Sequence, residues 1–203
     1  MFTKEDLTNS NSIYKIPKNI HLNKGVLLDY RLFNALVDAD KKRDHNYDFD
    51  VFLPKYGINL QRPYVWEHYQ QNEFIISVLL EKPIDPIIAI EYIADYKNRD
   101  NVIIYIIDGK QRLMTIQKFG RNEFPVIING KEVYYNDFDY DMKMFFQSRV
   151  NYLTANVYYS YPDAFVTDDM KIILFNYYNF SGTPQTKEHK DMLEALVEKN
   201  CQK

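Results

Sequence analysis

The sequence predicts an α+β fold, and three observations support this class. Two short apolar runs rich in β-branched residues, Ile87–Ile93 and Val102–Ile107, are typical of buried strands. Segments with apolar residues at helical spacing, from about Glu67 to Glu81 and from Lys110 to Phe119, lie beside these runs. Asn129-Gly130, between Phe124–Ile128 and Lys131–Tyr135, is a strong signal for the type I′ turn of a β-hairpin.

Length and composition limit the class of protein. With 203 residues, 46% of them hydrophobic and 26% charged, the chain can bury one globular core. The net charge of −3 argues against a protein that coats DNA nonspecifically, so any DNA contact would need a local basic patch. The single cysteine, Cys201, excludes a disulfide framework and a zinc-ligand spacing. No signal peptide and no bilayer-spanning apolar run are found, so we expect a cytoplasmic protein without a membrane partner.

The first part of the chain gives weaker signals than the rest. Residues 1–25 are polar and irregular, whereas Val26–Asp38 carries apolar residues at near-helical spacing and predicts a helix. Asp48–Ile58 alternates weakly and predicts an edge strand or a loop. We therefore expect an N-terminal extension, residues 1–59, packed on a domain formed by residues 60–203.

Helical and strand patterns continue to alternate after the hairpin. In chain order, the sequence predicts a helix over Asp137–Gln147, a strand over Asn151–Tyr159, a helix that Thr167 caps and that runs to about Tyr178, and a helix over Thr186–Lys199. A polar loop over Asp95–Asn101 is expected to join the two apolar strands.

The junction after the second apolar strand is the main candidate site. Asp108-Gly109 ends the strand, and the first turn of the following helix carries Lys110, Gln111 and Arg112. The start of a helix offers unpaired backbone N–H groups and the positive end of the helix dipole. With two cations beside it, this geometry favours a bound anion such as phosphate. A strand–turn–helix joint with a solvated first turn is the alternative.

Two other segments carry polar residues next to predicted helix ends. Gln61-Arg62-Pro63-Tyr64-Val65-Trp66 is a turn with one cation and two large aromatic residues before the helix that begins near Glu67. Asn179-Phe180-Ser181-Gly182-Thr183 is a glycine-bearing loop between two predicted helices, where backbone N–H groups could reach a ligand.

These segments resemble one known family. Asp108-Gly109-Lys110-Gln111-Arg112-Leu113 resembles the Asp-Gly-Gln-Gln-Arg-Leu signature of the N-terminal domain of GmrSD-type restriction enzymes, within the ParB/sulfiredoxin-like superfamily. The segment Gln61–Trp66 is similar to the family's Gln-Arg-x-Tyr-Val-Trp, and Pro83–Ile87 to its Pro-Ile-Pro-Pro-Ile entry into a strand. The segment after Asn179 is similar to Asn-Thr-Gly-Gly-Thr but departs from it at Phe180 and Ser181. The resemblance spans roughly Gln61–Val197.

The resemblance implies a fold and an activity. The expected fold is a ParB/sulfiredoxin-like core, a small mixed sheet flanked by helices. The expected activity is binding of a nucleoside triphosphate, and its hydrolysis, linked to DNA restriction or DNA processing. Four scattered histidines form no His-Asn-His grouping, so we expect a stand-alone copy of the domain without the HNH nuclease half.

Each motif residue has an expected role on this interpretation. Arg112 and Lys110 would hold the β- and γ-phosphates, and Gly109 would let the backbone approach them. Asp108 would bind Mg²⁺ or orient a water, which Gln111 would help to position. The remaining candidates for nucleotide contacts are Gln61, Arg62, Asn179, Gly182 and Thr183.

Several alternatives remain open at this point. Lys110 replaces the family's usual Gln, which favours phosphate binding but removes a hydrogen bond that turnover could need, so binding is better supported than hydrolysis. Asp108 could instead be a helix N-cap, and Arg112 could form a structural ion pair. The alternative function is a non-catalytic binding or regulatory protein, for example one encoded by a phage or mobile element, that engages host DNA-transaction machinery through a protein partner. A weak nuclease activity of the fold itself is a third hypothesis.

Overall fold

The computed structural model describes residues 20–29, 31–38, 45–93, 102–160, 166–179 and 195. The strands are β1 (Ile20–Leu27), β2 (His45–Asp48), β3 (Phe52–Leu53), β4 (Ile58–Asn59), β5 (Ile87–Ile93), β6 (Val102–Asp108), β7 (Val126–Ile128), β8 (Lys131–Val133) and β9 (Thr154–Ser160). The helices are α2 (Leu32–Val37), α3 (His68–Leu79), α4 (Lys110–Gly120), α5 (Tyr140–Asn151), α6 (Asp168–Asn179) and the short 3₁₀ helix η1 (Tyr135–Asp137).

A mixed five-stranded sheet, in the order β1-β9-β5-β6-β2, organises the fold. β5 lies at its centre, parallel to β9 and antiparallel to β6. β1 pairs antiparallel with β9 at one edge, and β2 pairs parallel with β6 at the other. Two small hairpins, β3–β4 and β7–β8, lie outside this sheet.

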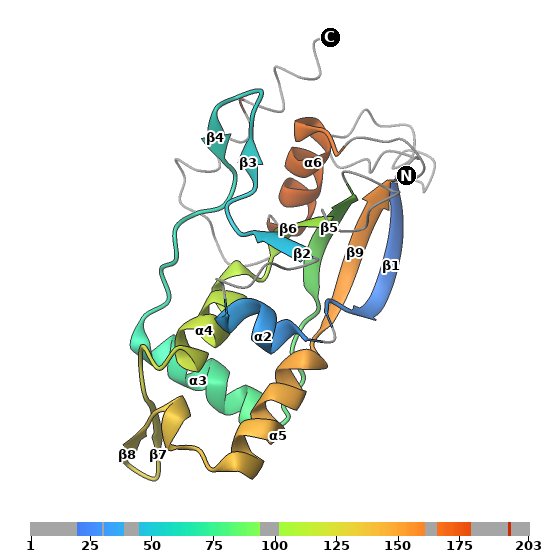
Figure 1. Ribbon diagram of the computed structural model, residues 1–203. Coiled ribbons are helices and arrows are strands. Elements are labelled where there is room, and N and C mark those ends of the chain that lie inside the picture. Colours follow the sequence, from blue (N-terminus) through green and yellow to red (C-terminus); the bar gives the residue numbers. More distant parts are fainter. Residues whose placement is uncertain are drawn as a thin grey trace, which may run out of the picture.

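Both faces of the sheet are covered, as Figure 1 shows, with α2 to α5 on one side and α6 on the other. Successive side chains of a strand point to opposite faces, so β5 and β6 contribute to two separate cores. The side chains of β5 and β6 that pack with α2 to α5 are Ile87, Ala89, Val102, Ile104 and Ile106. Those that pack with α6 and the β3–β4 hairpin are Ile88, Ile90 and Ile107. Burial on both faces explains why the two strands appear in the sequence as continuous apolar runs.

The predicted α+β class and most of the predicted elements are confirmed. β5 has the predicted bounds, and β6 and α4 meet at Gly109 as expected. The β7–β8 hairpin turns at Asn129 and Gly130, both with positive φ (52° and 74°), as a type I′ turn requires. The hydroxyl of Thr167 accepts a hydrogen bond from the backbone N–H of Met170 at the start of α6, as an N-cap does.

The predictions before residue 60 were less accurate. The helix predicted over Val26–Asp38 is limited to α2, and Ile20–Leu27 form β1, which was not predicted. The alternation of apolar residues in β1 is interrupted by a register shift between Asn23 and Val26. The uninterrupted alternating stretch is therefore too short to be recognised as a strand. Asp48–Ile58, predicted as an edge strand or loop, contains the end of β2 and the β3–β4 hairpin.

The helix predicted over Asp137–Gln147 begins later, as α5. Its N-cap is Asp139, whose carboxylate accepts a hydrogen bond from the backbone N–H of Met142 at 2.8 Å. The residues before it form η1 instead, in which the carboxylate of Asp137 accepts a hydrogen bond from the backbone N–H of Tyr134. This local capping moves the helix by three residues at its start.

Part of the predicted N-terminal extension belongs to the main core. β1 and β2 are strands of the main sheet, and α2 packs on α4, so part of the segment before residue 60 is integral to the core. The division at residue 60 stays a prediction. The loop over Asp95–Asn101 and nearly all of the helix over Thr186–Lys199 lie outside the described residues. Among the described helices, none combines the length and apolarity that crossing a bilayer demands.

Candidate functional site

Gly109 forms the joint between β6 and α4. Its φ of +108° lies in a region that side-chain-bearing residues rarely adopt. A Cβ at this position would lie 2.5 Å from Cδ1 of Ile87, so any larger residue would also force the Ile87 side chain on β5 to move. The first intrahelical bond of α4 runs from the N–H of Leu113 to the carbonyl of Gly109. The N–H groups of the first turn therefore have no acceptor within the helix.

A pocket of about 190 Å³ opens beside this joint. Its lining residues come from the loop before α3, from the β6–α4 junction and from the end of α6, and they are Gln61, Arg62, Trp66, Asp108, Gly109, Lys110, Gln111, Arg112 and Asn179. Eight of the ten residues predicted as site candidates thus lie around one pocket. The other two, Gly182 and Thr183, lie outside the described residues. Trp66 is an additional lining residue.

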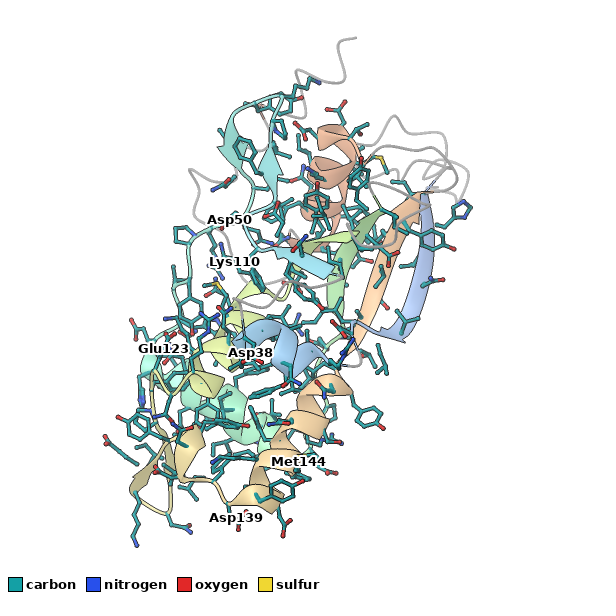
Figure 2. All side chains as sticks on the ribbon, in the orientation of Figure 1. Asp38, Asp50, Lys110, Glu123, Asp139 and Met144 are labelled. Carbon is teal, nitrogen blue, oxygen red and sulfur yellow. The ribbon has the colours of Figure 1, made fainter. Side chains whose placement is uncertain are left out.

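The described residues that line the pocket include three cationic side chains and one carboxylate, that of Asp108. Lys110 is buried, and its Nζ donates to Oδ1 of Asp50 at 2.7 Å. Figure 2 shows these two side chains beside each other near the start of α4. Nη2 of Arg112 donates to Oδ2 of Asp108 at 3.0 Å, and its Nη1 donates to the carbonyl of Asp85. Within the described ranges, the guanidinium of Arg62 has no ion-pair partner.

Three side-chain amides line the pocket, and hydrogen bonds fix their orientation. Nε2 of Gln61 donates to the carbonyls of Ile106 and Ile107 at 2.7 and 2.8 Å, which directs its oxygen away from β6. Nδ2 of Asn179 donates to the carbonyls of Ile107 (3.3 Å) and Phe175 (2.9 Å), which ties the end of α6 to β6.

Gln111 holds the loop before α3 against α4. Its Oε1 accepts from the backbone N–H groups of Val65 (2.9 Å) and Trp66 (3.3 Å), and its Nε2 donates to the carbonyl of Pro63 (3.1 Å). Both lone pairs of Oε1 are therefore used. The expected role of Gln111 in positioning a water stays a prediction, and the observed bonds assign this side chain to bracing the loop.

Tyr64 supplies a second attachment of this loop. Its hydroxyl lies 2.8 Å from Oγ1 of Thr115 on α4 and accepts from Nε2 of Gln71 on α3 at 2.8 Å. The ring of Trp66 packs edge-on against Phe74 of α3, with ring centroids 5.5 Å apart. These contacts place Gln61 and Arg62 at the pocket, although they lie about 50 residues before α4 in the sequence.

The alternatives considered for Asp108 and Arg112 can be compared with the geometry. The N-cap residue of α4 is Gly109 rather than Asp108, and no described side chain caps this end of the helix. Arg112 does form an ion pair, with Asp108 at i,i+4, but the Arg112 side chain is only 13% exposed whereas Asp108 is 48% exposed. This pair borders the pocket, so an ion pair and a ligand-binding role do not exclude each other.

The described lining of the pocket offers one carboxylate, that of Asp108, to a cation. In the part of the chain that the structure describes, no three His, Cys, Asp or Glu side chains come together as a metal site. Mg²⁺ commonly uses one or two protein carboxylates and completes its shell with phosphate oxygens and water. Asp108, whose Oδ1 accepts no hydrogen bond from the described residues, fits that requirement.

Two polar groups of the site were not predicted from the sequence. Asp50, which pairs with Lys110, stands 60 residues before it, and nothing in the pattern of its segment connects the two. The carbonyl of Asp85, which accepts from Arg112, is a backbone group, so the residue type at this position does not predict the contact. Trp66 was in the motif but was not among the predicted site residues, although it lines the pocket.

Comparison with known proteins gives one match. Residues 33–197 match the family model described as the GmrSD restriction endonuclease, N-terminal domain. Neither the curated proteins nor the solved structures gave a match. The ParB/sulfiredoxin-like assignment of the fold therefore stays a prediction.

Proposed function

Because the chain belongs to the GmrSD restriction endonuclease N-terminal domain family, we propose that its pocket binds a nucleoside triphosphate. The family links the chain to restriction endonucleases. That the ligand is a nucleotide is inferred separately, from the residues around the pocket.

The observation that carries the proposal is the set of positive groups around the start of α4. Arg62, Lys110 and Arg112 line one pocket, together with the backbone N–H groups that α4 leaves without acceptors. Among the described residues that line it, Asp108 supplies the one carboxylate. A helix start with arginine and lysine beside it is suited to the oxygens of phosphate groups, which accept several charge-assisted hydrogen bonds at once.

The pocket volume is consistent with the phosphates as the part that is held. About 190 Å³ is less than the 300–1,000 Å³ of sites that enclose a whole drug-sized ligand. The phosphate chain would lie against Gly109 and the first turn of α4. The indole of Trp66, at the same pocket, offers an aromatic surface to the nucleoside.

Hydrolysis would require further groups. Asp108 would hold Mg²⁺, which supplies charge neutralisation to transferring phosphates. Gln61, whose amide nitrogen is used by two carbonyls, presents its oxygen as an acceptor for a water. The oxygen of Gln111 is occupied by two backbone N–H groups, and this observation favours the second candidate function, nucleotide binding without turnover.

Titration of the purified chain with each of the four nucleoside triphosphates, with and without Mg²⁺, tests the proposal by isothermal calorimetry. We expect at least one nucleotide to bind, and Arg62→Ala to weaken its binding about tenfold or more, because a charge-assisted contact is worth about 1.4 kcal/mol or more. Lys131→Ala, which removes the same charge from the β7–β8 hairpin outside the pocket, is the matched control. Absence of binding for all four nucleotides would disprove the proposal.

Phosphate release separates the two candidate functions. A nucleotide-hydrolysing domain should release phosphate in reactions that contain Mg²⁺. If DNA is a partner, adding plasmid DNA should make the release faster than in reactions without DNA. Tight binding without release under any of these conditions would identify a nucleotide-dependent binding or regulatory protein. Incubating the plasmid with divalent metal ions and no nucleotide tests the third hypothesis, a nuclease activity of the fold itself.

A further inference from the structure

Lys110 has an unusual environment for a lysine. It is only 5% exposed, although it is the first residue of α4 and lines the pocket. A buried ammonium without a counter-charge is costly, so a lysine at this position needs a partner. Oδ1 of Asp50, at 2.7 Å, is that partner.

Asp50 is bound to Lys110 through its side chain but is held in place by its backbone. Its N–H donates to Oδ1 of Asp48 at 2.9 Å, and its carbonyl accepts from the N–H of Gln61 at 3.1 Å. Its side chain is 59% exposed and has no second partner among the described residues. The carboxylate can therefore leave Lys110 by rotating into solvent, while the backbone keeps its position.

We propose that Asp50 is a built-in competitor for the phosphate site, which pairs with Lys110 when the pocket is empty and is displaced when a polyphosphate binds. This inference rests on the proposed nucleotide site and adds the residue that sets its affinity. Asp50 stabilises the empty pocket because it compensates a buried charge. It weakens ligand binding because the ligand must replace it at the same ammonium.

The two effects have opposite signs, and this distinguishes the proposal from a purely structural ion pair. Asp50→Asn should lower the thermal stability of the ligand-free chain, since Lys110 loses its counter-charge. The same change should strengthen polyphosphate binding, because no carboxylate then competes. At saturating ligand the difference in stability between wild type and variant should disappear, since Asp50 no longer contacts Lys110 in either complex.

The experiment uses inorganic tripolyphosphate as the probe, with calorimetric titration and thermal unfolding of the full chain. We expect Asp50→Asn to bind the probe about tenfold more tightly than wild type. Glu123→Gln is the matched control, because Glu123 forms a similar pair, at 2.9 Å, with Lys118 of the same helix outside the pocket. It should leave the affinity unchanged.

A double-mutant cycle assigns the effect to Lys110. In a Lys110→Gln background, the Asp50→Asn change should leave the affinity unchanged, because the group for which the carboxylate competes is absent. A gain in affinity that persists without Lys110 would overturn the proposal and indicate a general effect of net charge.

The outcomes separate this proposal from the nucleotide site on which it rests. If wild type binds tripolyphosphate and Asp50→Asn binds it equally or less tightly, the competition is disproved and the site stands. If neither protein binds, both are disproved. Binding by the variant alone would support the competition and would disprove the proposed function for the wild-type pocket.

Discussion

At its N-terminal end α4 borders a polar pocket, whereas at its C-terminal end it packs into the aromatic core, and each end contains a glycine for a different reason. Gly109 is needed for a backbone conformation and for the approach of Ile87. Gly120 has an ordinary helical conformation, but a Cβ there would lie 2.5 Å from Cγ2 of Val37 and 3.0 Å from the ring of Phe33. The N-terminal end of α4 thus borders a charged pocket that a ligand could enter, whereas the C-terminal end is closely packed.

This contrast suggests that one helix separates stability from binding. The C-terminal half supplies Ile116 and Phe119, both fully buried in the core shared by α2 to α5. The N-terminal turn supplies Lys110 and Arg112, whose ion-pair partners are about half exposed. Changes at the C-terminal end should therefore unfold the chain, and changes at the N-terminal end should alter ligand binding at a smaller cost in stability.

The largest effect is expected from Phe119→Ala. The ring of Phe119 has no exposed surface, and its centroid lies within 6 Å of four other rings, those of Phe124, Tyr135, Phe138 and Phe146. Deleting it should lower the free energy of unfolding by about 3–5 kcal/mol, because the cavity adds to the loss of buried apolar area. Urea unfolding followed by circular dichroism measures the change. A loss below about 1 kcal/mol would show that this end of α4 is not a packed core.

Gly120→Ala should have the next largest effect, through overpacking. The new methyl group would overlap Val37 of α2, and we expect a loss of about 1–3 kcal/mol, reduced by the higher helix propensity of alanine. The same urea titration measures it. In a Val37→Ala background the substitution should cost less, because the overlapping methyl group is absent. Equal costs in both backgrounds would contradict the close α2–α4 contact.

Arg112→Ala tests the other end of the helix. It removes the bond to Asp108 and the bond to the carbonyl of Asp85, and it should weaken nucleotide binding at least about tenfold, or 1.4 kcal/mol, measured by calorimetry. Lys118→Ala is the control on the same helix, since Lys118 pairs with Glu123 outside the pocket. Unchanged affinity of the Arg112 variant would remove this residue from the site.

The sequence predicted those elements whose signals are local. The apolar runs of β5 and β6, the glycine at the joint and the Asn-Gly turn each act within a few residues, and each was placed correctly. β1 was missed because a bulge breaks its alternation, and α5 was shifted because Asp139 caps it while Asp137 closes η1 instead.

The candidate site shows the same division. Its residues on α4 and in the loop before α3 could be named from the motifs, because each lies in a short contiguous segment. The connection of Lys110 to Asp50 depends on β2 lying at the edge of the sheet beside β6, which is a tertiary fact with no local signal. The role of Gln111 was also obscured for this reason, since its partners are backbone groups of another segment.

The smallest effect concerns pH, and at the C-terminal end of α4 it comes from Tyr135. Burial of Tyr135 beside Phe119 raises the pKa of its hydroxyl, and a hydrogen bond from Gln147 offsets this only in part. The folded chain therefore keeps this proton at pH values where the unfolded chain has begun to lose it. The contribution of this hydroxyl to the free energy of unfolding is fully present below about pH 10, the ordinary pKa of tyrosine. It is lost as the pH rises above that value.

Tyr135→Phe removes this dependence because phenylalanine has no proton to lose. The free energy of unfolding should fall less steeply above pH 10 in the variant, by at most about 1.4 kcal/mol per pH unit, while nucleotide affinity at neutral pH stays the same. Tyr140→Phe, at a tyrosine that is 76% exposed, is the control and should leave the curve unchanged. Because burial also raises the pKa of Tyr105 and Tyr158, on the strands, a residual slope should persist in the Tyr135 variant. If the Tyr135 variant and wild type lost stability in parallel, the alkaline sensitivity would have to come from the sheet rather than from the aromatic core at the end of α4.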